Sequence, residues 1–197
     1  MAPKISSPTD SLDRRTSTRV FPRRGLSASH LIIAALTCAL SVGNVFGAGP
    51  QDNKRAALRD VRKRGPVVVG KIPNYKVNQC LSAGFRNALR RIHHIPSCQG
   101  LFDSLGANGI EVLGNSTYTL AREDWEQQVC KDSNAFVVVG STKVRLCGAF
   151  GWLSEADAAK VLIHEALHSA GLGEYPQDPD GPTAAEIDEM VKKHCGF

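Results

Sequence analysis

The sequence predicts a small α+β domain in which helices flank a small sheet. Two β-rich runs, residues 136–139 and 144–146, are separated by Gly-Ser-Thr-Lys and favour a β-hairpin. Apolar side chains recur at helical spacing in residues 81–92, and residues 155–170 form a broad apolar surface without an internal Pro or Gly. Helical and β-rich runs along a chain of 197 residues therefore predict one mixed domain.

Shorter elements are expected between these segments and after them. They are a strand at 67–69, a brief helix at 101–105, strands at 110–113 and 118–120, and a last helix from Ala184 to about His194. Thr183 and Glu186 have the spacing of a capping box, which marks the start of that last helix.

The helix expected at residues 155–170 has signals at both ends. Ser154 precedes it as a capping residue, and Asp157 lies in the positively polarised first turn. Gly171 follows the last turn and can adopt the positive φ that ends a helix, because it has no Cβ. The chain can then turn sharply and bring Glu174 back toward the helix.

This helix carries His164, Glu165 and His168. Residues four apart share one helix face, so the two imidazoles can reach a single metal ion, and zinc is commonly bound by imidazole nitrogen. Glu165 points roughly 100° away from His164, which places it beside the metal as a base for the attacking water. Catalytic zinc sites use three protein ligands, and Glu174 is the predicted third. These residues predict a zinc hydrolase.

The His-Glu-x-x-His run with Gly171 and Glu174 resembles the zincin metallopeptidases, and its spacing is similar to the longer metzincin signature. That signature ends in a third histidine where this chain has Glu174. The resemblance covers only the C-terminal part of the chain. It implies a zincin-like domain, His164 and His168 as zinc ligands, Glu165 as the general base, and a peptide or protein substrate.

The third ligand has alternatives. Gluzincins take it from a Glu on a following helix, where this chain has Glu186 and Glu189. Glu186 already has a capping role, and Gly171 gives Glu174 a route back to the histidines, so Glu174 is favoured. The Met-turn of metzincins is not evident in the sequence.

Residues 1–47 are predicted to be a secretory signal peptide. Basic residues precede an apolar run at 31–42, and small residues are compatible with cleavage between Gly47 and Ala48. This apolar run is too short for an ordinary membrane span, so no membrane contact is expected after cleavage, and an uncleaved N-terminal anchor is the alternative. The protein is therefore expected to be secreted or periplasmic.

Residues 48–64 form a basic segment with six basic and two acidic residues. It is predicted to be either a partly helical, solvated tail or a pro-segment that is trimmed near Lys63 and Arg64. The metallopeptidase domain is assigned to residues 65–197, which contain 12 basic and 15 acidic residues and thus carry a net charge of −3. No nucleic-acid partner is expected for that region.

Five of the six cysteines follow the predicted cleavage site, and in an exported protein they indicate disulfide bonds. The expected pairs are Cys130 with Cys147, which bracket the hairpin, and Cys80 with Cys98, around a helix. The alternative is that Cys195 joins the last helix to the body of the domain.

Together these features predict an exported zinc metallopeptidase with one zinc ion per chain. The alternative is a secreted, disulfide-bonded binding or inhibitory module in which zinc is structural or absent. The motif also permits hydrolysis of a non-peptide bond. Substrate specificity and oligomeric state have no readable signal in the sequence.

Overall fold

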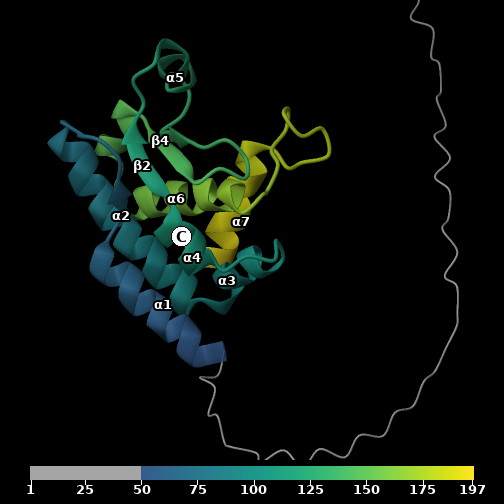
Figure 1. The fold of residues 1–197 in the computed structure, drawn as a ribbon. Helices are drawn as coiled ribbons and strands as arrows, with labels where there is room; N and C mark the ends of the chain where they lie inside the picture. Colours follow the sequence, from purple (N-terminus) through teal and green to yellow (C-terminus); the bar gives the residue numbers. More distant parts are fainter. Residues whose placement is uncertain (1–49) are drawn as a thin grey trace, which may run out of the picture. The chain divides into compact units, whose positions relative to one another are not determined.

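The computed structural model describes residues 50–197, so the predicted signal peptide lies outside the described residues. This part of the chain is a mixed α+β domain, as the sequence predicts (Figure 1). The helices are α1 (Pro50–Arg64), α2 (Tyr75–His94), α3 (Pro96–Asp103), α4 (Gly109–Asn115), α5 (Asp124–Val129), the 3-10 helix η1 (Gly148–Trp152), α6 (Glu155–Ser169) and α7 (Ala184–Cys195). The strands are β1 (Val67–Val68), β2 (Thr117–Leu120), β3 (Ala135–Phe136) and β4 (Lys143–Leu146). No helix between residues 50 and 197 is long and apolar enough to cross a membrane.

The four strands form one mixed sheet in the order β1-β2-β4-β3. β2 is parallel to both β1 and β4, whereas β3 is antiparallel to β4. The central pair aligns Tyr118 with Val144, and both side chains are buried. β3 is an edge strand in the described part of the chain, and it contacts α6, the helix that carries the two histidines.

The predicted hairpin is confirmed, but its first strand is shorter than expected. Phe136 pairs with Arg145, and the chain then leaves β4. Gly140, at a φ of +76°, donates its N–H to the carbonyl of His168 at 2.9 Å. The valines after Phe136 therefore run toward the end of α6 instead of extending the sheet.

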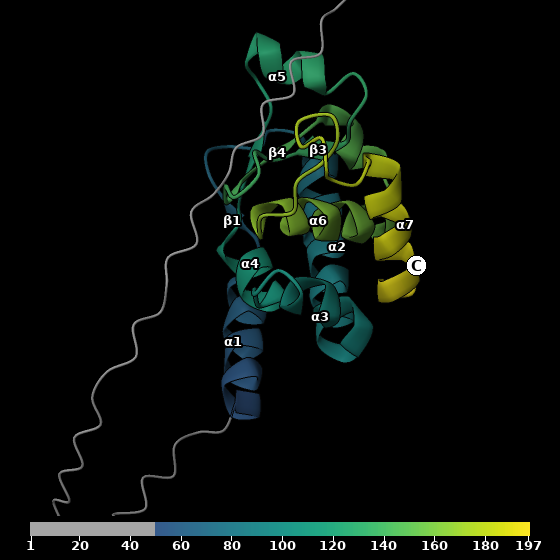
Figure 2. The same cartoon turned by 90° about the vertical axis from the view of Figure 1, so that its right-hand side faces the viewer.

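The core lies where α2 packs on α6 beneath the sheet, and Figure 2 shows α6 crossing in front of α2. Gly84 of α2 allows this close approach, because a Cβ there would lie 2.7 Å from the Cβ of Ala158. Leu162 and Ile163 of α6 are buried in the same core. Each large apolar side chain contributes about 1.5–3 kcal/mol on burial, so this packing holds the histidine-bearing helix in place.

Gly84→Ala is expected to destabilise the protein by about 1–3 kcal/mol, because the added methyl group overlaps Ala158. Gly100 in α3 is the matched control, since no atom of another segment lies within 4 Å of where its Cβ would be. Gly100→Ala is expected to stabilise the protein by about 0.5–1 kcal/mol through helix propensity. Thermal unfolding shows whether each substitution lowers or raises the melting temperature. A raised melting temperature for Gly84→Ala would contradict the close packing.

The strand predicted at 110–113 is wrong, because those residues lie in helix α4. The Asn108 side chain accepts hydrogen bonds from the backbone N–H groups of Ile110 and Glu111, which caps the helix at its start. Ile110 and Leu113 are both buried, at helical spacing. A short apolar run fits either structure, and the cap at Asn108 favours the helix.

Other predicted elements are confirmed, and two helices are longer than expected. α2 begins at Tyr75 and not at residue 81, because the Asn74 side chain caps it by accepting from the N–H of Lys76 at 3.0 Å. α3 begins at Pro96, whose missing N–H costs no hydrogen bond in a first helical turn. The confirmed elements are the strands expected at 67–69 and 118–120 and the helices expected at 155–170 and 184–194.

The basic segment at the start of the described chain is helix α1, which packs against α4 and α2. Val61 is 4% exposed and faces Gly114 of α4, which has no room for a side chain. Leu58 packs against the same core. The helix expected in this segment is present. One expectation was a solvated tail, but the helix packs on the rest of the folded unit.

Two disulfide bonds link the described cysteines. The predicted pair Cys130–Cys147 is confirmed. The predicted pair Cys80–Cys98 is wrong: Cys98 bonds to Cys195, which was the alternative, and Cys80 remains a buried thiol. Cys80 lies on α2, and its thiol donates to the carbonyl of Leu153 just after η1, whereas Cys98 lies on α3, which packs against α7. Disulfide bonds of this kind are typical of an oxidising compartment.

Candidate metal centre

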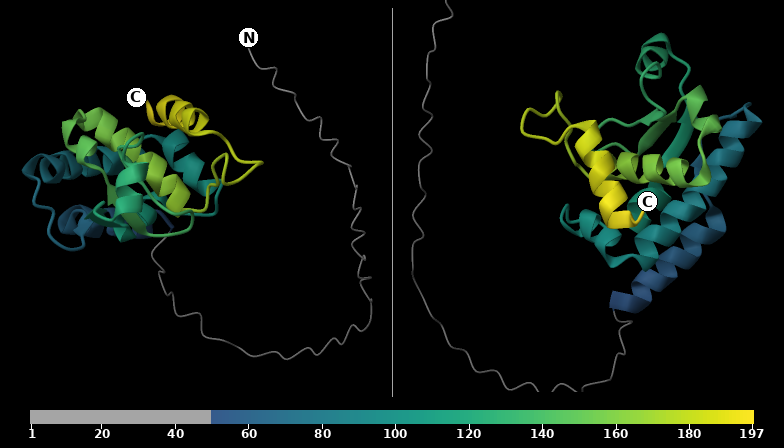
Figure 3. Two further views of the ribbon diagram at one scale, coloured as in Figure 1. Left: turned by 90° about the horizontal axis from the view of Figure 1, so that it is seen from above. Right: turned by 180° about the vertical axis from the view of Figure 1, so that it is seen from behind.

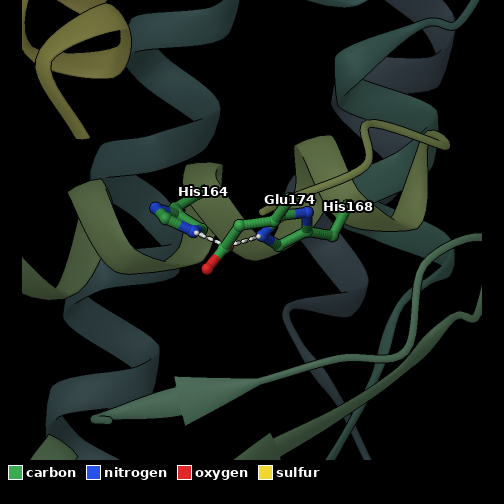
Figure 4. A group of neighbouring side chains, drawn as sticks. All are labelled: His164, His168 and Glu174. Carbon is green, nitrogen blue, oxygen red and sulfur yellow. Dashed lines mark hydrogen bonds and ion pairs between the residues drawn. The ribbon is translucent and has the colours of Figure 1, made fainter. Parts of the chain in front are cut away.

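Three side chains from α6 and the turn after it converge on one point (Figure 4). α6 places His164 and His168 one turn apart, with their ring centroids 4.9 Å from each other. Gly171 has a φ of +105° and turns the chain at the end of the helix. Its N–H donates to the carbonyl of His168 at 3.0 Å, and the chain then returns Glu174 to the two histidines.

The three potential ligand atoms lie close enough to share one metal ion. Oε2 of Glu174 is 2.8 Å from Nε2 of His168 and 3.5 Å from Nε2 of His164. All three atoms lie within 4.8 Å of one another. Ligand atoms around a tetrahedral zinc ion are about 3.3 Å apart, so small side-chain shifts would bring all three to bonding distance. This group could hold a metal ion.

Both histidines are held in an orientation that suits a metal ligand. Nδ1 of His168 donates to the carbonyl of Leu172 at 2.8 Å, and Nδ1 of His164 donates to the carboxylate of Asp188 at 2.9 Å. Each Nε2 is then left to face Glu174. Metal-binding histidines commonly donate their other ring N–H to an oxygen in this way, which fixes the ring and its tautomer.

Asp188 also belongs to this site, although it was not predicted from the sequence. It lies on α7, and its second oxygen accepts from Nζ of Lys160 on α6 at 3.1 Å. Burial is the largest single effect on His164 and lowers its pKa, but the hydrogen bond to Asp188 and the negative charges of Glu165, Asp188 and Glu174 together outweigh it and leave the pKa raised. The same hydrogen bond lowers the pKa of Asp188. The only hint of Asp188 was Lys160, which lies one turn before His164. The sequence does not indicate which carboxylate pairs with this lysine.

Glu165 lies beside the cluster and is not part of it. It is 6% exposed, and its Oε2 atom is buried with no hydrogen-bond partner among the described residues. Burial raises the pKa of Glu165 to about 7, with a further increase from Glu174 and a partial decrease from His164. A carboxyl group with such a pKa can take up and release a proton near neutral pH.

A cavity of about 640 Å³ lies over the cluster. Its lining includes His164, Glu165, His168 and Glu174, together with residues 132–139, which contain β3. The lining found in the described chain contains no Lys or Arg. A substrate in this cavity would meet the three potential ligands and Glu165 together.

The alternative third ligands are placed elsewhere. Glu186 accepts from the N–H of Thr183 at 2.8 Å and completes the capping box of α7. Glu189 is exposed and pairs with Lys192 at 3.4 Å. Among the three glutamates considered, the structure brings only Glu174 to the histidines.

Comparison with known proteins does not identify a family. No protein-family model matches the chain, and neither does any curated protein or solved structure. The arrangement itself offers two imidazoles and a carboxylate that could bind a cation, and a second carboxylate, from Glu165, that can move a proton.

Proposed function

We propose that this protein is an exported zinc metallopeptidase. The observation that carries the proposal is the convergence of His164, His168 and Glu174 beside a buried, unpaired Glu165 in one cavity. Structural zinc sites are closed by four protein ligands, whereas catalytic sites have three and leave one position open. Three potential ligands that line a cavity therefore support a catalytic site.

The donor set fits zinc. Imidazole nitrogen and carboxylate oxygen are both common zinc ligands, and two histidines with one Glu form a known catalytic combination. A buried carboxylate oxygen without a protein partner, as at Glu165, is uncommon, and a bound water, an ion or a catalytic role accounts for such an atom. When bound, zinc supplies a Lewis acid that polarises a carbonyl group and makes water more acidic.

Glu165 carries out the proton transfers in this proposal. Its carboxylate accepts a proton from the attacking water and delivers it to the leaving amine. The neighbouring backbone of Val137 favours the ionised form of this carboxyl and partly offsets the rise in its pKa caused by burial. Glu165 lines the cavity, so a water molecule held there lies beside its carboxyl group, and burial keeps bulk water away from Oε2.

The edge strand supports a peptide as the substrate. β3 pairs with β4 on one side, and residues 134–139 line the cavity. An extended peptide can add to such an edge through main-chain hydrogen bonds. That mode of binding would hold a peptide bond over His164 and His168 without requiring a particular side chain.

Two further observations support export. Residues 1–47 have the composition of a signal peptide. The disulfide bonds Cys98–Cys195 and Cys130–Cys147 suit an oxidising compartment.

Asp188→Asn is expected to lower the affinity for zinc about 10–100-fold, because His164 loses the charged acceptor that orients its ring. Titration of the metal-free protein in competition with a chromophoric chelator measures this affinity. Glu189→Gln is the matched control, since it removes the same charge from an exposed position of α7. Equal affinities for the two variants would show that Asp188 does not support His164.

Metal analysis of the purified protein, followed by digestion of a peptide library, tests the proposed function. We expect one zinc ion per chain, and peptide cleavage that stops on chelation and returns when zinc is added. Stoichiometric zinc without cleavage of any peptide would instead favour a binding module with a structural metal. Cleavage that persists without metal would exclude the proposed chemistry.

His168→Ala tests the ligand assignment directly. The variant should lose high-affinity zinc binding and activity together, because one of three protein ligands is gone. His94→Ala, an exposed histidine at the end of α2, is the control and should retain both. A His168→Ala protein that binds one zinc at wild-type affinity would refute the two-histidine site.

A further inference from the structure

The outer face of α1 carries a basic row, which consists of Arg55, Arg59, Arg62 and Lys63. These residues follow one another at helical spacing, on the side of the helix opposite Val61. Val61 faces the core, and all four basic residues are exposed. Because α1 is packed on the domain, the row is a fixed surface and not a loose tail.

On this face of α1, no Asp or Glu lies between the four residues of the basic row. Asp60 pairs with Arg64 at 2.6 Å, and both residues lie off the row. Among the described side chains, neither Arg59 nor Lys63 forms an ion pair. Like charges one helical turn apart destabilise a helix, so a bound anionic partner would relieve this repulsion.

The basic row also makes the charge of the folded domain uneven. Residues 50–64 contain six basic and two acidic residues, whereas residues 65–197 contain 12 basic and 15 acidic ones. No residue of α1 lines the cavity, and Figure 3 shows α1 on the opposite side of the domain from the loop that precedes α7. An anionic surface would be attracted to α1 and would leave the cavity open.

We propose that the basic row docks the domain on a membrane surface rich in anionic lipids. Clusters of four to eight Lys and Arg on an amphipathic helix such as α1 are typical of binding to anionic lipid headgroups. The apolar run at 31–42, which is predicted to be the core of a signal peptide, ends eight residues before α1 begins at Pro50, so the row closely follows a segment that is expected to meet a membrane during export. A nucleic acid would also attract these charges, but no feature of the neighbouring sequence favours a nucleic acid as the partner.

This proposal differs from the expectation that the protein has no membrane contact after cleavage. That expectation rested on the short apolar run at 31–42, whereas the contact proposed here is made by the basic face of α1. Cleavage before Ala48 would leave α1 on the domain, and the docking surface would remain. The inference does not depend on the proposed catalytic function, because none of its residues belongs to the metal centre.

Co-sedimentation of the purified full chain with lipid vesicles tests the proposal. The wild type should bind vesicles of phosphatidylglycerol and phosphatidylcholine more tightly than vesicles of phosphatidylcholine alone, and high salt should abolish the difference. Each basic residue near such a surface contributes about fivefold to binding, so replacing all four residues of the row by Gln should lower it at least about 100-fold. Residues 1–49 are the same in every protein compared, so any difference in vesicle binding between the wild type and this variant is due to α1.

A second quadruple variant controls for net charge. It replaces four exposed lysines scattered over the domain by Gln, namely Lys71, Lys131, Lys143 and Lys193. Its net charge equals that of the α1 variant, and its binding should fall less than about tenfold if the row is the docking surface. Circular dichroism confirms folding, and Arg59→Gln/Arg62→Gln, with an expected loss of about 25-fold, replaces the α1 variant if the latter unfolds.

Three results would overturn the proposal. Equal losses for the two quadruple variants would mean that net charge, and not the row, controls binding. Equal binding of the wild type to anionic and neutral vesicles would remove the electrostatic basis. Binding of a short DNA duplex as tight as that of the anionic vesicles, with the same loss in the α1 variant, would assign the row to nucleic acid.

Discussion

Glu165→Gln is expected to bind zinc as tightly as the wild type and to lose about 10²–10⁴-fold in kcat. Gln has nearly the shape of Glu but cannot accept the proton that the proposed mechanism requires. The three clustered ligand residues do not include Glu165, so the substitution leaves His164, His168 and Glu174 in place. Steady-state turnover of a peptide found in the library digest, measured together with zinc content, separates the two effects.

Glu155→Gln is the matched control, because it makes the same change in the exposed first turn of α6. It should retain both zinc and turnover. Full turnover by Glu165→Gln would refute the role of Glu165 as a base. Loss of zinc from Glu165→Gln would place Glu165 within the metal site itself.

The metal-free protein gives a second test of the environment of Glu165. Burial raises the pKa of this carboxyl from 4.5 to about 7 in the folded state, so the folded state binds the proton more tightly than the unfolded state. This contribution to stability is complete below pH 4.5 and is lost as the pH rises toward 7. The stability difference between the wild type and Glu165→Gln should therefore shift against the wild type over that range. Urea unfolding of both metal-free proteins at several pH values measures it.

Most of the candidate metal centre could be predicted from the sequence because the rules that build it are local. His164 and His168 share a face wherever the segment is helical. The Ser154 side chain accepts from the N–H of Asp157 at 3.1 Å and starts that helix, and Gly171 ends it at a φ of +105°. Each of these signals lies within a few residues of the position that it controls.

Asp188 could not be predicted because its partner is distant in the chain. It lies 24 residues after His164, on another helix. Its approach to His164 depends on how α7 packs against the body of the domain through Ile187 and Val191, which are both buried. Helical spacing fixes which face of α7 is apolar, but it does not fix where that face is placed.

The incorrect prediction of a strand at 110–113, where the structure has a helix, has a different cause. Gly109 and Gly114 lie at the two ends of this run and lower its helix propensity. In the fold, both glycines permit close packing: a Cβ on Gly109 would overlap the ring of Phe102, and a Cβ on Gly114 would overlap Val61. These contacts account for the two glycines and are not visible in a window of the sequence, whereas the Asn108 cap that starts the helix is a local signal.

Removal of the Cys98–Cys195 disulfide is expected to lower the free energy of unfolding by about 2–5 kcal/mol. The bond joins residues 97 apart, so its loss releases a large part of the unfolded chain from constraint. It also anchors the end of α7, where Arg91 donates to the carbonyl of Cys195 at 2.7 Å. Because α7 carries Asp188, Cys98→Ala/Cys195→Ala should also weaken zinc binding.

Cys130→Ala/Cys147→Ala separates these two consequences. Its disulfide joins residues 17 apart, and its loss should cost about 3 kcal/mol, but it does not hold α7 and should leave zinc affinity unchanged. Urea unfolding and zinc titration of both double variants measure stability and affinity. Equal zinc affinities would show that Ile187 and Val191 hold Asp188 against His164 without the disulfide. A weaker affinity for Cys98→Ala/Cys195→Ala alone would show that the disulfide connects the stability of the fold to the metal centre.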